Sequence, residues 1–288
     1  MAKVLVTGGS GMLGGYVSKA LEHASHVVVL ADRAKFDLAD PDAAYDYVLA
    51  EKPAAILHLA AETNVDLCEL NPQQAGIRNH LSTASIAKAA EKSGAWMLYV
   101  STSNVFGERG SFEHNELDLP SPVNYYGRSK LMGEYAVRQH CPLNHLIVRA
   151  GWMIGGGASG DHKFVGKLIQ QIREGAVSLR AVGDKFGSIT RASLLSDFIV
   201  WALESRCTGT LHYTSKGTVT RFNIAQMIGE IIGKDVVITS VKSSDFPLSA
   251  PRPFSEGMSS IYTPLLTAAP QPGNWRDDLA SYVATFLD

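Results

Sequence analysis

The first 150 residues alternate short apolar runs with longer amphipathic segments. The apolar runs, rich in β-branched residues, predict strands at residues 3–8, 26–32, 54–61, 96–102 and 143–150. The segments between them predict helices at 12–22, 41–51, 73–92 and 125–139. Strands that are apolar on both faces and separated by helices are typical of a parallel sheet covered on both sides. The pattern therefore predicts an α/β fold with a doubly wound (Rossmann) parallel sheet.

The pattern is less regular after residue 150. Residues 151–162 are glycine-rich and predict a loop, and helices are expected at 163–175, 193–205 and 222–233, with a short strand near 210–215. The proline-containing stretch 242–275 also predicts a loop. We expect a Rossmann domain at residues 1–150 and a smaller C-terminal lobe at 151–288, with segments of the second part returning to the first.

Composition excludes several classes of protein. Of 288 residues 45% are apolar and 19% are charged, and the net charge of -2 provides no basic face for nucleic acid or a membrane surface. The apolar runs are too short to span a bilayer, and the N-terminus enters a strand without a signal peptide, so we expect a cytoplasmic protein. The three cysteines have no metal-like spacing, and we expect reduced thiols and no metal.

A glycine-rich turn, TGGSGMLGG, joins the first strand to the first helix. Gly8, Gly11 and Gly14 recur every third residue, which lets the backbone approach a pyrophosphate that helix N–H groups then hold. Glycines also close plain tight corners, but the flanking strand and helix favour a dinucleotide site. Residues 1–150 are thus predicted to be the dinucleotide-binding domain, and residues 151–288 to bind mainly substrate.

The end of the second strand gives conflicting signals about the cofactor. Asp32 is placed to accept hydrogen bonds from a ribose 2′-hydroxyl, which favours NAD. Arg33 and Lys35 follow at once and can hold a 2′-phosphate, which favours NADP, unless they belong to a solvated turn. The residues alone leave both cofactors open.

The stretch NYYGRSKLMGE holds two tyrosines and a lysine on a predicted helix. Tyr126 lies four residues before Lys130 and shares its face, whereas Tyr125 points elsewhere. The ammonium is expected to lower the pKa of Tyr126 and make it a proton donor near neutral pH. The same spacing also occurs in ordinary surface pairs.

Hydroxyl groups end the fourth predicted strand. Ser101, Thr102 and Ser103 lie where the carboxyl ends of parallel strands line a ligand crevice. A hydroxyl there can hydrogen-bond a substrate carbonyl that faces the tyrosine, although Ser and Thr are also common where a strand becomes a loop. Together with the glycine turn and the tyrosine–lysine pair, the three features indicate an oxidoreductase site.

Over nearly its whole length the chain resembles the extended short-chain dehydrogenase/reductases. The resemblance rests on TGGSGMLG, the Asp37–Leu38 pair, LHLAAET, Asn79, STSNVFG and YYGRSK. Within that superfamily it is most similar to the dTDP-4-dehydrorhamnose reductases, in HLAAETNVDLCELNP, NYYGRSKLMGE, LIVRAGWMIGGG, GDKFGSIT and APRP.

The resemblance implies roles for individual residues. Thr102, Tyr126 and Lys130 would be catalytic, with Tyr126 as proton donor. Ser103 and Trp152 would face the substrate, unless Trp152 is a core aromatic. The cofactor would be bound by Gly11, Met12, Leu13, Asp37, Leu38, Ala60, Ala61 and Thr63, in addition to Gly8, Asp32 and Arg33 from the motifs above.

Two stretches depart from the family pattern. The reductases usually carry Asp-Tyr after the catalytic hydroxyl, and this chain has Ser103-Asn104. The Asp-Glu pair of the 4,6-dehydratases is also absent, which argues against dehydration because Ser and Asn are poor proton-transfer groups. The stretch FSEGMSS after Arg252-Pro253 differs as well, so we assign no substrate contacts there.

The resemblance implies NAD(P)H-dependent reduction of the 4-keto group of a nucleotide-linked 6-deoxy sugar. We expect NADPH as cofactor, with NADH as the alternative, and a possible homodimer. One alternative function is a nucleotide-sugar epimerase of the same superfamily, which would consume no cofactor. Another is a non-catalytic, cofactor-binding regulatory subunit, although drift of that kind usually damages the tyrosine, lysine or hydroxyl.

Overall fold

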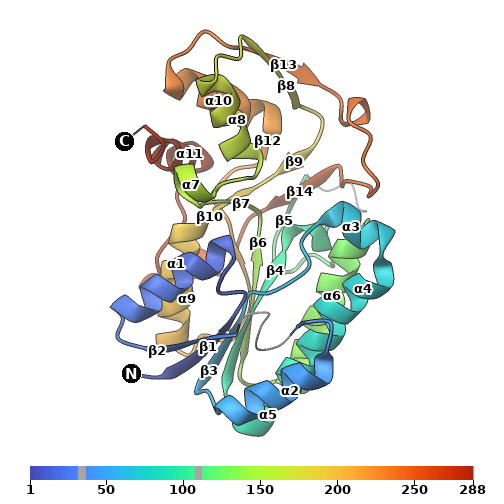
Figure 1. Cartoon of the computed structure of the whole chain (residues 1–288), viewed down its shortest axis with the longest axis vertical. Helices are drawn as coiled ribbons and strands as arrows, with labels where there is room; N and C mark the ends of the chain where they lie inside the picture. Colours follow the sequence, from blue (N-terminus) through green and yellow to red (C-terminus); the bar gives the residue numbers. More distant parts are fainter. Residues whose placement is uncertain (32–36, 108–111, 288) are drawn as a thin grey trace.

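The computed structural model describes residues 1–31, 37–107 and 112–287. Figure 1 shows a lower lobe built around one sheet and an upper lobe made mainly from later residues. The two lobes meet where the strands of the lower sheet end, opposite the loops at the base of the upper lobe.

The lower lobe contains a six-stranded parallel sheet in the order β11-β6-β4-β3-β1-β2. Its strands are β1 (Lys3–Thr7), β2 (Val27–Ala31), β3 (Ala55–His58), β4 (Trp96–Thr102), β6 (His145–Ala150) and β11 (Gly209–Tyr213). Every residue of β3 and β6 is buried, as expected for inner strands covered on both faces. The five strands predicted in the first 150 residues are confirmed, as is the one near 210–215.

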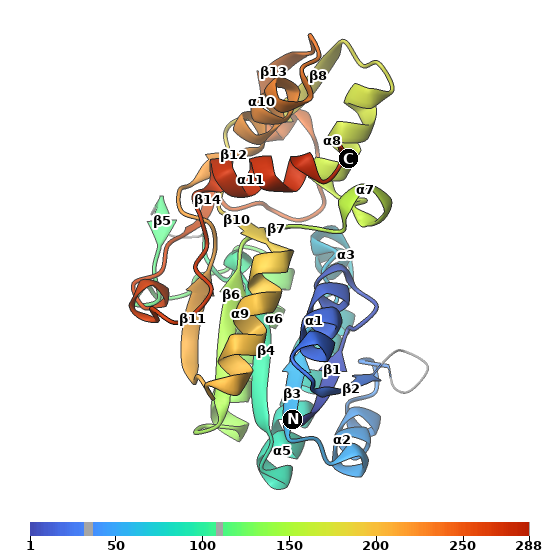
Figure 2. The ribbon, with the colours of Figure 1, turned by 90° about the vertical axis from the view of Figure 1, so that its left-hand side faces the viewer.

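Helices cover both faces of this sheet, which confirms the doubly wound fold (Figure 2). One face packs against α1 (Met12–His23) and α9 (Ala192–Glu204) through an apolar cluster that includes Val17 and Phe198. The opposite face packs against α2 (Pro41–Glu51), α5 (Ser82–Ser93) and α6 (Tyr125–His140). Helix α2 begins as predicted, because the Asp40 side chain accepts a hydrogen bond from the backbone N–H of Ala43 at 3.0 Å.

The single helix predicted at 73–92 is wrong in detail. The chain forms α3 (Val65–Leu70), α4 (Pro72–Gly76), a π-helical turn η1 (Ile77–Leu81) and then α5, which ends at Gly94 in the left-handed conformation. The wider π turn contains the buried Asn79, whose amide donates to the Ser129 hydroxyl on α6 and to the Glu62 carbonyl, both at 3.0 Å. A local hydrogen-bonding requirement therefore overrides the regular helical period.

The upper lobe packs helices against short strands around its own apolar core. Its sheets are β10-β7, β13-β8 and β12-β9-β14-β5. The helices are α7 (Gly157–Gly160), α8 (Phe164–Arg173), α10 (Arg221–Ile232) and α11 (Trp275–Ala284). Of the 3-10 turns, η2 (Ser103–Val105) directly follows β4 of the lower sheet, η4 (Thr263–Leu265) contacts β11, and η3 (Ser243–Asp245) follows β13. The strands are β5 (Glu113–His114), β7 (Trp152–Ile154), β8 (Ser178–Val182), β9 (Phe186–Gly187), β10 (Ile189–Arg191), β12 (Val219–Thr220), β13 (Val237–Val241) and β14 (Ser255–Met258).

Two loop predictions are wrong here. Residues 151–162 contain β7 and α7, and residues 242–275 contain β14. Each of these strands pairs with a neighbour over only two or three residues, which is too few for a periodic signal. Helix α11 was not predicted. The division into domains at residue 150 stays a prediction, and the chain crosses that boundary because β11 pairs with β6 and α9 packs against α1.

Candidate active site

A cleft of about 850 Å³ lies between the carboxyl ends of the lower sheet and the upper lobe. The predicted site residues that the structure describes all line it. They are Gly8, Gly11, Met12, Leu13, Asp37, Leu38, Ala60, Ala61, Thr63, Thr102, Ser103, Tyr126, Lys130 and Trp152. Asp32 and Arg33 lie outside the described residues. The sequence therefore predicted which side chains meet, and their roles stay predictions.

The glycine turn has no room for side chains at two positions. Gly8 has a φ of +71°, and a Cβ on it would lie 2.8 Å from the backbone nitrogen of Ala60. A Cβ on Gly14 would lie 2.2 Å from the carbonyl oxygen of Gly8. The turn is closed by the Gly11 N–H, which donates to the Gly8 carbonyl at 3.0 Å. This packing presents bare backbone and the first N–H groups of α1 to the cleft, an arrangement that fits a pyrophosphate.

The far end of the same groove contains Asp37, Leu38 and Arg78. The Arg78 guanidinium lies 3.5 Å from the Asp37 carboxylate, and both side chains are partly exposed. The Ser82 hydroxyl donates to the Leu38 carbonyl and fixes the loop against α5. Arg78, from the π turn, was not predicted, because a helical pattern does not show which side of a π turn faces a ligand.

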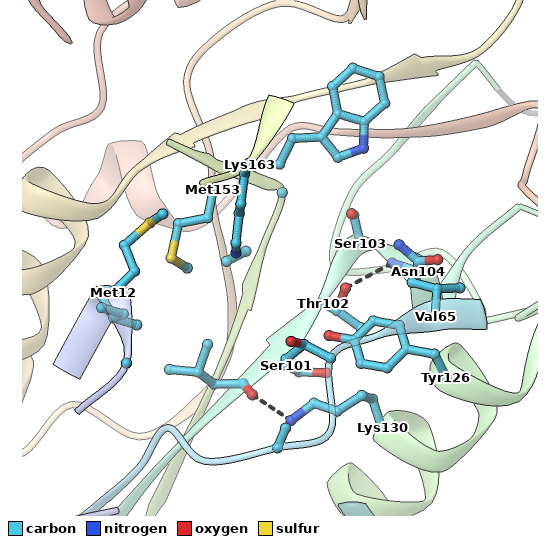
Figure 3. A pocket seen from close by; sticks show the side chains of 18 of the residues that line it. Met12, Val65, Ser101, Thr102, Ser103, Asn104, Tyr126, Lys130, Met153 and Lys163 are labelled. Atoms are coloured by element: carbon cyan, nitrogen blue, oxygen red, sulfur yellow. Dashed lines mark hydrogen bonds between the residues drawn. The ribbon is translucent and has the colours of Figure 1, made fainter. Parts of the chain in front are cut away.

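Tyr126 and Lys130 line the cleft from the first turns of α6. The helix begins where the Asn124 side chain accepts from the Gly127 N–H at 2.8 Å. Tyr126 is 9% exposed and Tyr125 is 40% exposed, and only Tyr126 lines the cleft. Figure 3 shows the Tyr126 ring pointing toward Thr102, with Lys130 one turn below. The predicted shared face of Tyr126 and Lys130 is therefore present.

The predicted effect of Lys130 on Tyr126 is wrong. Burial raises the pKa of Tyr126 to about 12, while a hydrogen bond with the Thr102 side chain acts in the opposite direction. Burial also lowers the pKa of Lys130 to about 7, and Glu134 counteracts that shift. Spacing on a helix shows that the two side chains share a face, but burial disfavours the charged form of each.

Three neighbouring hydroxyls at the end of β4 have different partners. Ser101 donates to the buried Glu134 carboxylate at 2.7 Å, and Ser103 donates to the Glu256 carboxylate at 2.5 Å. Thr102 instead accepts from the Asn104 backbone N–H at 3.2 Å (Figure 3). Thr102 is thus the hydroxyl whose side chain interacts with Tyr126.

Glu256 lines the cleft although no site residue was predicted after Pro253. It comes from β14, and its carboxylate accepts hydrogen bonds from Ser103, from Asn104 at 2.6 Å and from the Trp152 indole at 2.7 Å. The signal available in the sequence was an acidic residue beside small residues in SEGM, which resembles an exposed turn. Its true position follows from pairing of β14 with β9, a long-range contact.

The upper-lobe side of the cleft is rich in cations. Lys163, Lys185, Arg221 and Arg252 line it. Arg252 is held by Asp66 of α3, whose carboxylate lies 2.7 Å from the guanidinium. Burial would raise the pKa of Asp66, but the hydrogen bond from the Ala250 N–H and the contact with Arg252 together lower it. The Arg221 guanidinium lies 4.6 Å from the Trp152 ring and 4.8 Å from the Phe164 ring. These cations were also missed by sequence reasoning.

Among residues 1–31, 37–107 and 112–287, no group of three His, Cys, Asp or Glu side chains is arranged to hold a metal ion. Within those ranges no helix combines the length and apolar character needed to cross a membrane. The expected absence of a metal, the expected location and the possible homodimer stay predictions.

Comparison with known proteins identifies the family. Residues 2–287 match the family model described as RmlD substrate binding domain. The dTDP-4-dehydrorhamnose reductase of Salmonella typhimurium is 30% identical over 264 residues, 87% of each chain. The crystal structure of a dTDP-4-dehydrorhamnose reductase from Yersinia enterocolitica is 57% identical, with a TM-score of 0.98 over 99% of this chain and 100% of that one.

A third relative is the structure of a dTDP-4-dehydrorhamnose reductase from Bacillus anthracis in complex with NADP. It is 27% identical, covers 98% of this chain and 99% of its own, and has a TM-score of 0.90. These comparisons confirm the resemblance seen in the motifs. The chain belongs to the RmlD substrate binding domain family, within the extended short-chain dehydrogenase/reductases.

Proposed function

We propose that the protein is an NADPH-dependent reductase of the 4-keto group of a nucleotide-linked 6-deoxy sugar, of the dTDP-4-dehydrorhamnose reductase type. The observation that carries this proposal is that Thr102, Tyr126 and Lys130 line the same cleft as the glycine turn. Relatives that cover most of the chain carry that activity in their names.

The glycine turn supports the choice of a dinucleotide cofactor. Bare backbone at Gly8 and Gly14 and the N-terminus of α1 would hold its pyrophosphate, with Met12 and Leu13 in the first turn. Asp37 and Leu38 would lie beside the adenosine, and Ala60, Ala61 and Thr63 would line the path toward the reacting end. The relative from Bacillus anthracis was found with NADP, which supports NADPH over NADH.

The protonation state of Tyr126 suits reduction. A pKa of about 12 keeps the hydroxyl protonated at neutral pH, so it is available as an acid. Reduced nicotinamide, when bound, supplies the hydride. The proton passes from the Tyr126 hydroxyl to the ketone oxygen, which becomes a hydroxyl, while Thr102 holds that oxygen by a hydrogen bond. General acid catalysis of this kind contributes ~10²- to 10⁴-fold.

Lys130 would support this step by stabilising the Tyr126 phenolate. Its amine is held on the Val100 carbonyl at 2.8 Å, one turn along α6 from Tyr126. When Tyr126 gives up its proton, the protonated form of Lys130 would stabilise the phenolate, and the amine would also be available to hold the ribose of a bound cofactor. Lys130 is thus proposed as the group that stabilises the tyrosine anion after proton transfer.

The charge of the upper lobe supports a nucleotide-linked substrate. Lys163, Lys185, Arg221 and Arg252 give that side of the cleft a positive field suited to a diphosphate. Trp152 would contact the sugar, since it lines the cleft beside Arg221. Ser103 and Asn104 lack the acid–base groups that elimination requires, which favours reduction over dehydration.

The test is to mix the protein with NADPH or NADH and a panel of nucleotide-linked 4-keto-6-deoxy sugars. We expect loss of the reduced-nicotinamide absorbance with a dTDP-linked ketone and NADPH, in equal amounts with a reduced sugar product. Interconversion of two sugar epimers without net cofactor consumption would instead identify an epimerase. A protein that binds NADPH but turns over no substrate of the panel would be the regulatory subunit.

A further inference from the structure

Glu256 is a buried carboxylate in the part of the cleft that adjoins the catalytic hydroxyls. Its residue is 7% exposed, and its side chain lines the cleft together with Thr102 and Tyr126. Its negative charge is among the influences that raise the pKa of Tyr126, so the two groups share one electrostatic environment. The carboxylate is therefore close to the place where a ketone would meet the tyrosine.

The carboxylate accepts from three of the donors around it. The Ser103 hydroxyl and the Asn104 amide donate to Oε2 at 2.5 and 2.6 Å, and the Trp152 indole donates to Oε1 at 2.7 Å. An indole has one N–H and a hydroxyl has one hydrogen, so Ser103 and Trp152 have no donor left for a ligand. Ser103 keeps lone pairs, and the carboxylate has about four acceptor sites, of which three are used.

This arrangement makes the polar surface beside Thr102 mainly a hydrogen-bond acceptor, with one N–H of Asn104 left as a donor. A ligand hydroxyl at this place can donate a hydrogen bond to these acceptors. A ligand carbonyl or carboxylate at the same place would be repelled by their lone pairs and by the negative charge of Glu256. Burial raises the pKa of Glu256, although hydrogen bonds from Ser103 and Trp152 and the charges of two nearby arginines act to lower it. These interactions therefore do not fully offset the cost of burying the negative charge in the free protein. A further donor from a ligand would supply the missing compensation.

We infer that Glu256 determines specificity by accepting a hydrogen bond from the hydroxyl on the carbon next to the ketone and by rejecting sugars with an anionic group there. The inference rests on the proposed function and adds a residue that the sequence did not assign. Glu256 acts on substrate choice and placement, and the proton transfer remains with Tyr126.

The decisive experiment compares two enzymes with two substrates. The enzymes are wild type and Glu256→Gln, which keeps the size of the side chain and removes the charge. The substrates are the dTDP-linked 4-keto-6-deoxy sugar and its 3-deoxy analogue, which lacks the hydroxyl next to the ketone. For wild type we expect kcat/KM to fall roughly 10- to 100-fold on the analogue, because the analogue lacks one hydrogen bond to a charged group.

For Glu256→Gln we expect a loss of similar size on the parent sugar, mainly in KM, and little further loss on the analogue. The KM for NADPH should stay close to that of wild type, as should all values for the control Glu230→Gln, which changes an exposed glutamate of α10. If both enzymes lose the same factor on the analogue, Glu256 does not recognise that hydroxyl and the inference is wrong.

A second pair of variants separates this role from folding. The Ser103 oxygen lies 2.5 Å from Glu256 Oε2, so an aspartate at position 103 would bring a carboxylate to almost the same place. We expect Glu256→Ser to lose roughly 10-fold or more on the parent sugar and Ser103→Asp combined with Glu256→Ser to regain most of it. No recovery in a double variant that still binds NADPH overturns the inference. Failure of wild type to oxidise NADPH with any ketone is a different result, which overturns the proposed function itself.

Discussion

Lys130 donates a hydrogen bond from Nζ to the carbonyl oxygen of Val100 at 2.8 Å, which ties α6 to β4. The amine also lies 4.0 Å from the centre of the Tyr99 ring. The nearest carboxylate on its helix, Glu134, forms its ion pairs with Arg149 and Arg138. Burial is therefore the largest influence on the pKa of the Lys130 amine and lowers it to about 7.

This shift makes the stability of the protein depend on pH. The unfolded lysine binds its proton up to a pKa of 10.5, whereas the folded lysine releases it near 7. Between these values the unfolded state binds more protons, so stability rises with pH. We expect wild type to gain stability relative to Lys130→Met, by up to about 1.4 kcal/mol per pH unit, as the pH rises from about 7 to about 9.

Denaturant unfolding of both proteins at each pH measures this difference. The matched control is Lys167→Met, which removes an exposed lysine of α8 and leaves the buried site intact. A difference between wild type and Lys130→Met that is the same at every pH would show that Lys130 does not titrate in this range.

The second prediction concerns the two adjacent tyrosines. Tyr126→Phe removes the proton that we assign to the ketone oxygen, so kcat should fall ~10²- to 10⁴-fold while NADPH binds as before. Tyr125→Phe, the matched control, changes a ring that is 40% exposed and outside the cleft, and it should keep wild-type turnover. Steady-state kinetics and titration of NADPH fluorescence test both. Equal activity of the two variants would remove Tyr126 from the mechanism.

Most of the sheet could be predicted because its strands are buried on both faces. Such strands are apolar throughout, as in β3 and β6, and their signal lies within a few consecutive residues. The upper lobe was harder, since β7, β9, β12 and β14 are two to four residues long and are stabilised by distant partners. The π turn at Asn79 was missed for a similar reason, because it serves contacts with Glu62 and Ser129.

The site shows the same division between local and distant information. Gly8, Thr102, Tyr126 and Lys130 occur in short motifs whose spacing has a physical meaning, and they meet in one cleft. Glu256 reaches that cleft only through pairing of distant strands. The pKa of Tyr126 was predicted in the wrong direction because the sequence shows a neighbouring charge but not the degree of burial.

A buried ion pair behind the site provides a third prediction. Glu134 is fully buried and accepts from Arg149 at 2.7 and 2.9 Å and from Ser101 at 2.7 Å. Glu134→Gln leaves the buried guanidinium without its counterion, so we expect a loss of about 3–5 kcal/mol in the free energy of unfolding. Glu22→Gln changes an exposed glutamate of α1 and should cost little. A loss in Glu134→Gln no larger than in this control would mean that the arginine is compensated in another way.

The glycine turn offers the sharpest pair of variants, because Gly14 and Gly15 are adjacent on α1. A Cβ at Gly14 would lie 2.2 Å from the Gly8 carbonyl oxygen and 2.6 Å from the Gly9 Cα, so Gly14→Ala must displace the turn. A Cβ at Gly15 meets no atom within 4 Å. Gly15→Ala should therefore stabilise the helix by about 0.5–1 kcal/mol and leave NADPH affinity unchanged.

For Gly14→Ala we expect NADPH to bind roughly 10-fold more weakly or worse, about 1.4 kcal/mol, because the backbone that should hold the pyrophosphate has moved. Calorimetric titration of each variant with NADPH gives the affinity, and thermal unfolding without cofactor shows whether the fold is kept. Since both changes add the same methyl group to the same helix, a difference confined to binding would come from the turn. Equal NADPH affinity in the two variants would show that the cofactor does not depend on this backbone.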